Sequence, residues 1–184
     1  MGFIAVIDIE TNWDNEMMSI GAVIADDRDY RCVDSIYMVI DPCYKVRGMF
    51  SDRLFYKVKD NNIKCKRENA IQGLNEWFRE YGVDSLFAYN ASFDKNHIPE
   101  FGKYKWYDIM KIAAYKQYNR KITCGIECYR TGKMKRDYGV ESMMRMLSGD
   151  FYSETHNALQ DALDELKIME LLGLGIEIYQ NAQV

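Results

Sequence analysis

The sequence predicts an α/β fold in which a mixed five-stranded sheet is flanked by helices. Three observations predict it. Short apolar segments of strand length follow one another at the start of the chain. Later segments of this kind alternate with segments in which apolar residues recur at helical spacing. The resulting order, β-β-β-α-β-α-β-α, is typical of a sheet with helices packed against it.

Three strands are expected first. Residues 3–9 are an almost continuous apolar run, which is typical of a strand buried on both faces. Residues 17–25 and 32–40 are two further apolar segments, and the polar turn of residues 26–31 joins them. These segments predict a three-strand meander. Residues 42–66, which follow, are irregular and charged and predict no defined element.

Helices and two short strands are expected in the rest of the chain. Helices are predicted where apolar residues recur at helical spacing and a glycine follows as a stop signal. These segments are residues 67–81, 140–147 and about 156–172. Two short apolar segments predict the remaining strands, over residues 85–90 and 105–110.

Length and composition predict one domain. At 184 residues, with 48% apolar and 28% charged residues, the chain is expected to form a single domain over residues 1–184, with a basic loop insertion at about 111–138. No apolar run approaches the roughly 20 residues that cross a bilayer, and no secretory signal is seen, so a cytoplasmic location is expected. The five scattered cysteines favour free thiols over a disulfide framework.

Charge is distributed unevenly along the chain. The net charge is −4, but residues 111–136 contain eight lysines and arginines and one glutamate, so this segment carries +7 and the rest −11. Such a run is commonly a solvated face. It would also serve as a local phosphate-binding surface on a protein too acidic to hold nucleic acid by its overall charge. The sequence leaves both interpretations open.

Two carboxylates stand near the end of the first expected strand. Asp8 and Glu10 are two residues apart, so their side chains project from the same face. Carboxylates this close repel each other, and burying them is costly. A divalent cation would offset both effects, and carboxylate oxygens suit magnesium or manganese. A strand end that reaches solvent would also explain the pair, so a metal site requires further ligands.

Two later segments supply such ligands. Residues 89–94, YNASFD, place Asp94 just beyond the fourth expected strand, where open α/β sheets present ligands. The last expected helix carries His156 at its start and Asp161 in its second turn. Alanines flank Asp161 on the core-facing side, so its carboxylate is expected to point toward the sheet. His97, the other histidine, is interpreted as structural.

Three motifs together resemble those of a known family. DIET from Asp8, NASFD ending at Asp94, and HNALQDA from His156 are similar in order and spacing to the exonuclease motifs of the DEDD superfamily of 3′-to-5′ exonucleases. YDIMKIA and YGVESMMRML are similar to the intervening segments, so the resemblance covers nearly the whole chain. The tyrosine branch would carry tyrosine at Asn157. With His156 five residues before Asp161, the chain instead resembles the histidine (DEDDh) branch of DNA polymerase III epsilon-type subunits, oligoribonuclease and ribonuclease T.

The resemblance implies a ribonuclease H-like fold and two-metal hydrolysis of phosphodiester bonds. By motif position, the metal-binding carboxylates would be Asp8, Glu10, Asp94 and Asp161. Two magnesium or manganese ions about 3.5–4 Å apart would stabilise the attacking and leaving oxygens. His156 would be the general base, because a histidine with a pKa of about 6.5 is largely neutral at cellular pH. The product would be a nucleoside 5′-monophosphate.

Four further residues are candidates for substrate binding: Thr11, Trp13, Asn90 and Phe93. Trp13 stands where relatives often place an apolar residue against the terminal base, and Asn90 opens the second motif. Stacking on rings such as Trp13 and Phe93 contributes roughly 1 to 3 kcal/mol per base. Ordinary packing would explain both rings as well.

One cysteine pair resembles half of a zinc site. Cys124 and Cys128 form C-x3-C, but no second Cys or His pair at zinc spacing follows. Free thiols in a loop are therefore the preferred interpretation.

Three functions remain open. The leading one is a metal-dependent 3′-to-5′ exonuclease that binds the 3′ end of single-stranded DNA or RNA. The alternative is a non-cleaving module of the same fold that binds nucleic acid or a polymerase, although all five catalytic positions are intact. A ribonuclease H-type endonuclease is disfavoured because its second acid lies on a helix. No membrane partner is expected. The choice of DNA or RNA, substrate length, pathway and oligomeric state, a homodimer included, stay open.

Overall fold

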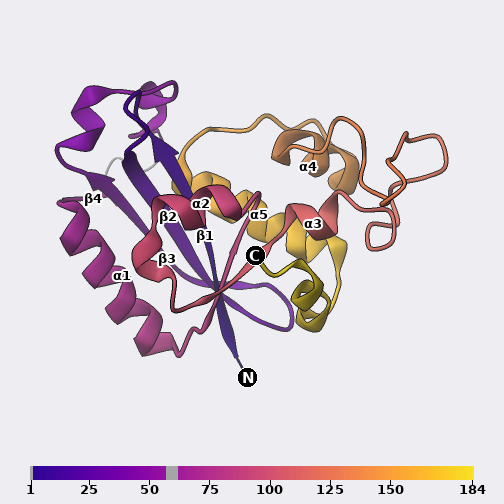
Figure 1. Ribbon diagram of the computed structural model, residues 1–184, viewed down its shortest axis with the longest axis horizontal. Helices are drawn as coiled ribbons and strands as arrows, with labels where there is room; N and C mark the ends of the chain where they lie inside the picture. Colours follow the sequence, from indigo (N-terminus) through magenta and orange to yellow (C-terminus); the bar gives the residue numbers. More distant parts are fainter. Residues whose placement is uncertain (1, 57–61) are drawn as a thin grey trace.

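The centre of the protein is a mixed sheet (Figure 1). The computed structural model describes residues 2–56 and 62–184, and over these residues the sheet has six strands in the order β4-β3-β2-β1-β5-β6. The long strands form two antiparallel pairs, β1/β2 and β2/β3, whereas β3/β4, β1/β5 and β5/β6 are parallel pairs. The strands are β1 (Phe3–Thr11), β2 (Met17–Asp26), β3 (Cys32–Ile40), β4 (Asn62–Cys65), β5 (Ser85–Ala88) and β6 (Lys105–Asp108).

Helices cover both faces of this sheet. The α-helices are α1 (Arg67–Tyr81), α2 (Ser92–His97), α3 (Met110–Ala113), α4 (Val140–Ser148) and α5 (Ala158–Leu172). The core on one face combines α1 with apolar residues of the sheet, and the core on the other combines α3, α4 and α5 with the sheet. Short 3-10 helices are η1 (Cys43–Val46), η2 (Ser51–Arg53), η3 (Pro99–Phe101) and η4 (Ile176–Ala182). The predicted fold class, a mixed sheet flanked by helices, is confirmed.

The prediction of five strands was wrong by one edge strand. β4 has four residues, two of them exposed, and pairs in parallel with Tyr37–Ile40 of β3. So short and polar a strand has no hydrophobic pattern of its own, and only its partner defines it. Helices α2 and α3 were missed because, with six and four residues, they are too short to show a helical periodicity. The last helix begins at Ala158 rather than about residue 156, so Asp161 lies in its first turn.

The faces of β1 determine where the two N-terminal acids lie. Alternate residues pack into the core with α1, namely Ala5, Ile7 and Ile9. Ile4 and Val6 pack into the other core, which includes α5. Asp8 and Glu10 continue this second set by strand alternation. Both carboxylates therefore lie on the face that α5 covers.

Helix α5 crosses β2 at unusually close range at Gly21. A Cβ atom at this position would lie 2.3 Å from the backbone of both Ala158 and Leu159. We expect Gly21→Ala to lower the free energy of unfolding by about 1–3 kcal/mol, because α5 must move away from the sheet. Gly73→Ala is the control, since its Cβ would meet only the Met38 side chain, at 3.6 Å. Within helix α1 this change should be neutral or stabilise by up to ~1 kcal/mol. Urea denaturation measures both, and an equal effect of the two changes would contradict the close approach.

The basic segment between α3 and α4 has little regular structure. Isolated bridges join Tyr115 to Lys133 and Cys128 to Met134, and Met134 is buried in the core beside α4. Cys124 is exposed, and no disulfide joins it to Cys128. Over residues 2–56 and 62–184, no helix combines the length and the hydropathy that a membrane span requires.

Candidate active site

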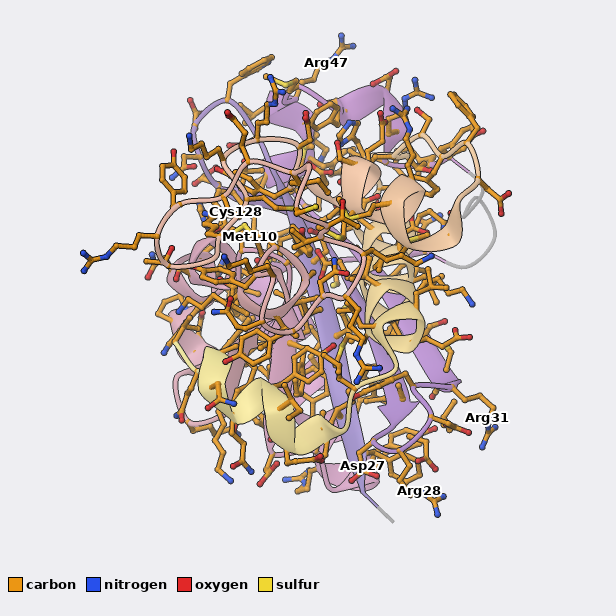
Figure 2. All side chains as sticks on the ribbon, turned by 90° about the vertical axis from the view of Figure 1, so that its right-hand side faces the viewer. Asp27, Arg28, Arg31, Arg47, Met110 and Cys128 are labelled. Carbon is orange, nitrogen blue, oxygen red and sulfur yellow. The ribbon has the colours of Figure 1, made fainter. Side chains whose placement is uncertain are left out.

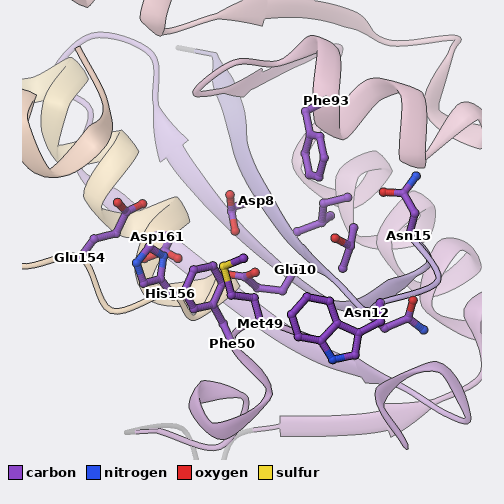
Figure 3. Close-up of a pocket in the computed structure, with 13 residues that line it drawn as sticks. Asp8, Glu10, Asn12, Asn15, Met49, Phe50, Phe93, Glu154, His156 and Asp161 are labelled. Atoms are coloured by element: carbon purple, nitrogen blue, oxygen red, sulfur yellow. The ribbon is translucent and has the colours of Figure 1, made fainter. Parts of the chain in front are cut away.

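A pocket of about 440 Å³ lies where the end of β1 meets the start of α5 (Figure 3). Seven of the nine residues predicted from the sequence line it: Asp8, Glu10, Thr11, Trp13, Phe93, His156 and Asp161. The side chains of Met49, Phe50 and Glu154 also face this pocket. Residues far apart in the sequence therefore converge on one cavity.

Three of these side chains form a compact group. One ligand atom each from Glu10, His156 and Asp161 lies within 4.8 Å of the others. Glu10 is near the end of β1, whereas Asp161 is in the first turn of α5 and is only 3% exposed. The close approach of α5 to the sheet therefore brings an acid from each element together.

Asp94 and Asn90 do not line the pocket. Asp94 lies on α2 and is 2% exposed, close enough to Asp8 that its charge raises the pKa of that carboxyl. Asn90 lies in the turn between β5 and α2 with a left-handed φ of 66°, and its N–H donates to Asp108 Oδ1 at 3.0 Å. Substrate binding by Asn90 therefore stays a prediction, and in this structure its backbone helps to hold the turn that leads to Asp94.

His156 lies just before α5 in a left-handed conformation, with a φ of 56°. The next residue, Asn157, caps the helix by accepting a hydrogen bond from the N–H of Gln160 at 3.3 Å. The Asn157 amide also donates to the carbonyl of Arg53 at 3.1 Å. The ring of Phe50 stacks on the imidazole with 3.8 Å between centroids and 11° between planes. Together these contacts fix the imidazole at the pocket wall.

Burial and mutual repulsion favour protonation of the acids in this group. Burial raises the pKa of Glu10 to about 7, and the Glu154 carboxylate adds to the rise. Burial, again with Glu154, raises the pKa of Asp161 to about 8. The pKa values of Asp8 and Asp94 are also raised, first by burial and then by neighbouring carboxylates. Burial lowers the pKa of His156, so its imidazole is neutral at cellular pH.

These shifts predict that the metal-free protein loses stability as the pH rises. Because the pKa values of Glu10 and Asp161 rise from 4.5 and 3.8 to about 7 and about 8, the native state binds more protons than the unfolded chain between these limits. The free energy of unfolding therefore decreases across this window and levels off above it. We expect a loss on the order of 1–3 kcal/mol between about pH 5 and pH 8. Urea denaturation in chelator measures it, and stability that rises with pH would contradict the prediction.

Sequence reasoning missed three acids around this group. Glu165, 2% exposed, lies one turn after Asp161 on α5 and accepts a hydrogen bond from the N–H of Tyr89 at 3.0 Å. Asp108 ends β6, and Glu154 lies at the pocket wall. The i, i+4 spacing of Asp161 and Glu165 signals a shared helix face. No sequence signal indicates Asp108, because its role depends on where β6 ends relative to β5.

The donor set fits divalent cations. Buried carboxylate oxygens of Asp8 (Oδ2), Asp94 (Oδ1) and Asp161 (Oδ1) have no hydrogen-bond partner among the described residues. Buried polar atoms normally have a partner, so these oxygens are free to act as ligands. Hard oxygen donors with clustered negative charge are those that magnesium and manganese prefer.

No protein-family model matches this chain, and no curated protein matches its sequence. Solved structures do match its fold. A 3′-exonuclease that recognises the 3′ end of the histone mRNA stem-loop matches with a TM-score of 0.64 at 16% identity, over 95% of this chain and 65% of that chain. The nuclease domain of 3′hExo, a DEDDh family member bound to rAMP, matches with a TM-score of 0.59 at 15% identity, over 97% and 92%.

Exonuclease X, solved with 5′ overhanging duplex DNA, matches with a TM-score of 0.57 at 21% identity, over 97% of this chain and 98% of that chain. The chain spans 65% of the first of these proteins and 60% of a full-length 3′-exonuclease that also matches. The likeness shows the fold: the described residues have the ribonuclease H-like fold of DEDDh exonucleases, as the motifs predicted.

Proposed function

We propose that this chain, which has the DEDDh exonuclease fold, is a metal-dependent 3′-to-5′ exonuclease. It would hydrolyse the terminal phosphodiester bond of single-stranded DNA or RNA and release nucleoside 5′-monophosphates. The observation that carries the proposal is the grouping of Glu10, His156 and Asp161 within 4.8 Å in a pocket that Asp8 also lines. The fold of the matching exonucleases supports it.

Asp8, Glu10, Asp94 and Asp161 would hold two magnesium or manganese ions. Their unpartnered oxygens and raised pKa values are the features that a bound cation would compensate. When bound, two such ions supply positive charge to both the attacking and the leaving oxygen of a phosphodiester displacement. The carboxylates would determine the position of the bound ions relative to the pocket.

His156 would act as general base. Its burial keeps the imidazole neutral, so a ring nitrogen is free to accept a proton from the attacking water. The Phe50 ring restricts rotation of the imidazole on one face, and the cap at Asn157 fixes its backbone. This arrangement holds a proton acceptor beside Glu10 and Asp161.

The terminal nucleotide would occupy the pocket. Trp13 is 66% exposed and Phe93 39% exposed although both line the cavity, and exposed rings at a pocket suit stacking on bases. Thr11 follows Glu10 at the end of β1 and lines the pocket, where it would contact the terminal sugar or phosphate. Stacking does not read sequence, so little base preference is expected.

A labelled oligonucleotide tests the function. With magnesium, a 5′-labelled strand with a free 3′ end should shorten stepwise, and the same strand with a blocked 3′ end should stay intact. Binding without shortening would support the non-cleaving module, and internal cuts would indicate an endonuclease; either result contradicts the proposal. Matched DNA and RNA strands of two lengths then define the substrate.

A further inference from the structure

A second cavity, of about 500 Å³, adjoins the active-site pocket between η1 and η2. Tyr44, Arg47 and Phe55 are among the residues that line it. We call this cavity the η1–η2 groove. None of the residues proposed for catalysis or for binding the terminal nucleotide lines it. Its chemistry differs from that of the acidic pocket, because two rings, two cations and only one acid, Asp52, are among the residues that line it. Of the two cations, Lys45 is paired with Asp41 at 2.7 Å, and Arg47 is the other.

A lysine from β4, outside the lining itself, lies over both rings of the η1–η2 groove. The Lys64 ammonium lies 5.4 Å from the centroid of the Tyr44 ring and 4.9 Å from that of Phe55. The two rings meet edge to face, with 6.4 Å between centroids. Arg47 projects outward from one end of the molecule (Figure 2) and makes no ion pair among the described residues. Two cations without an ion pair among the described residues, Arg47 and Lys64, beside two rings suit the binding of a single-stranded nucleic acid.

One short segment separates the groove from the pocket. Met49 and Phe50 line the pocket, whereas Arg47 and Ser51 line the groove. The carbonyl of Arg47 accepts a hydrogen bond from the N–H of Trp13, a pocket residue, at 2.9 Å. A strand that leaves the pocket over this segment therefore enters the groove directly.

The basic segment of residues 111–136 is placed less well for this role. It lies at the opposite end of the molecule from residues 43–56 (Figure 1). Two of its cations are already engaged: Lys135 pairs with Glu127 at 3.7 Å, and Arg136 pairs with Asp137 at 3.8 Å. Arg47 and Lys64, at the end of the molecule that carries the groove, make no ion pair within the part of the chain that the structure describes.

We propose that the η1–η2 groove binds the phosphates and a base of the strand that leads to the 3′ end in the pocket. The inference rests on the proposed function and deepens it, because it identifies the substrate as a strand of several nucleotides. Arg47 and Lys64 would contact phosphates, and the Tyr44 and Phe55 rings would contact a base. Very short products would lose these contacts and be degraded less efficiently.

The test compares two double variants that remove equal charge. Arg47→Asn/Lys64→Gln alters the groove; residue 47 has a φ of 66° and a ψ of 166°, and asparagine is chosen because it is enriched among non-glycine residues with a positive φ. Arg130→Asn/Lys133→Gln is the control, since the Lys133 ammonium also lies over a ring, that of Tyr138, at 4.3 Å. Fluorescence anisotropy in chelator measures binding of a single strand of about ten nucleotides as salt is varied. Thermal unfolding of both variants checks that they are folded.

We expect the groove variant to raise the Kd of the strand roughly tenfold and to make the slope of log Kd against log salt shallower by about 0.7 for each cation removed. Its ratio of kcat/KM between that strand and a dinucleotide should fall by a similar factor. The control should change either quantity by less than about twofold. Equal weakening by both variants, or weakening by the control alone, would overturn the proposal.

Failure of the proposed function would look different. If the wild-type protein binds the strand but never shortens it, the exonuclease proposal fails. The groove is still supported in that case if its variant alone weakens binding. If the strand is shortened but the groove variant binds it like wild type, the groove proposal fails and the exonuclease proposal stands.

Discussion

Asp8→Asn is expected to abolish most turnover and, at the same time, to stabilise the metal-free protein. The variant removes a carboxylate whose pKa is raised first by burial and then by the charges of Glu165, Asp94 and Asp161. Loss of this ligand should lower kcat roughly 10³-fold, the scale seen when one electrostatic stabiliser of a transition state is removed. Relief of repulsion should raise the free energy of unfolding by about 1 kcal/mol in chelator at about pH 8.

The control is Asp14→Asn, an exposed carboxylate in the loop that follows β1 and outside the pocket lining. It should change neither turnover nor stability measurably. Single-turnover kinetics with magnesium, calorimetric titration of manganese and urea denaturation in chelator separate the effects. Wild-type turnover or unaltered manganese affinity in Asp8→Asn would remove this residue from the proposed ligand set.

His156→Asn is expected to lower kcat about 10²- to 10⁴-fold, the usual contribution of a general base. Asparagine tolerates the left-handed φ of 56°, so its effect reports lost proton transfer, whereas alanine would add backbone strain. Because burial lowers the pKa of His156, wild-type activity should decline only on the acid side of the ordinary value of 6.5. The variant should lose this acid limb.

Manganese affinity decides between two roles for this imidazole. His156 lies within ligand distance of Glu10 and Asp161, so it is geometrically able to coordinate a metal. As a general base it should leave manganese affinity unchanged when replaced by asparagine; weaker binding would show that it is a ligand instead. His97→Asn is the control, since the His97 ring is hydrogen-bonded to the Phe93 carbonyl at 2.8 Å and lies outside the pocket lining.

Local patterns were sufficient for the main elements of the fold. The helix over residues 67–81 and the strand over residues 32–40 were predicted with the bounds observed, because their periodicity and stop signals are strong. β4 was not predictable, because a short polar edge strand exists only through its pairing with β3. No local pattern indicated that Met49 and Phe50 would line the pocket, because their position depends on how remote segments of the chain pack together.

The sequence by itself determined which chemistry the chain carries. Strand alternation fixed that Asp8 and Glu10 share a face, and the alanines around Asp161 fixed a close helix–sheet contact. Only the tertiary structure decided which groups meet: that Glu165 and Asp108 lie near the acids, that Phe50 stacks on His156, and that a groove with Arg47 and two rings adjoins the pocket. Distances between segments remote in the chain depend on packing of the whole core, which no local pattern encodes.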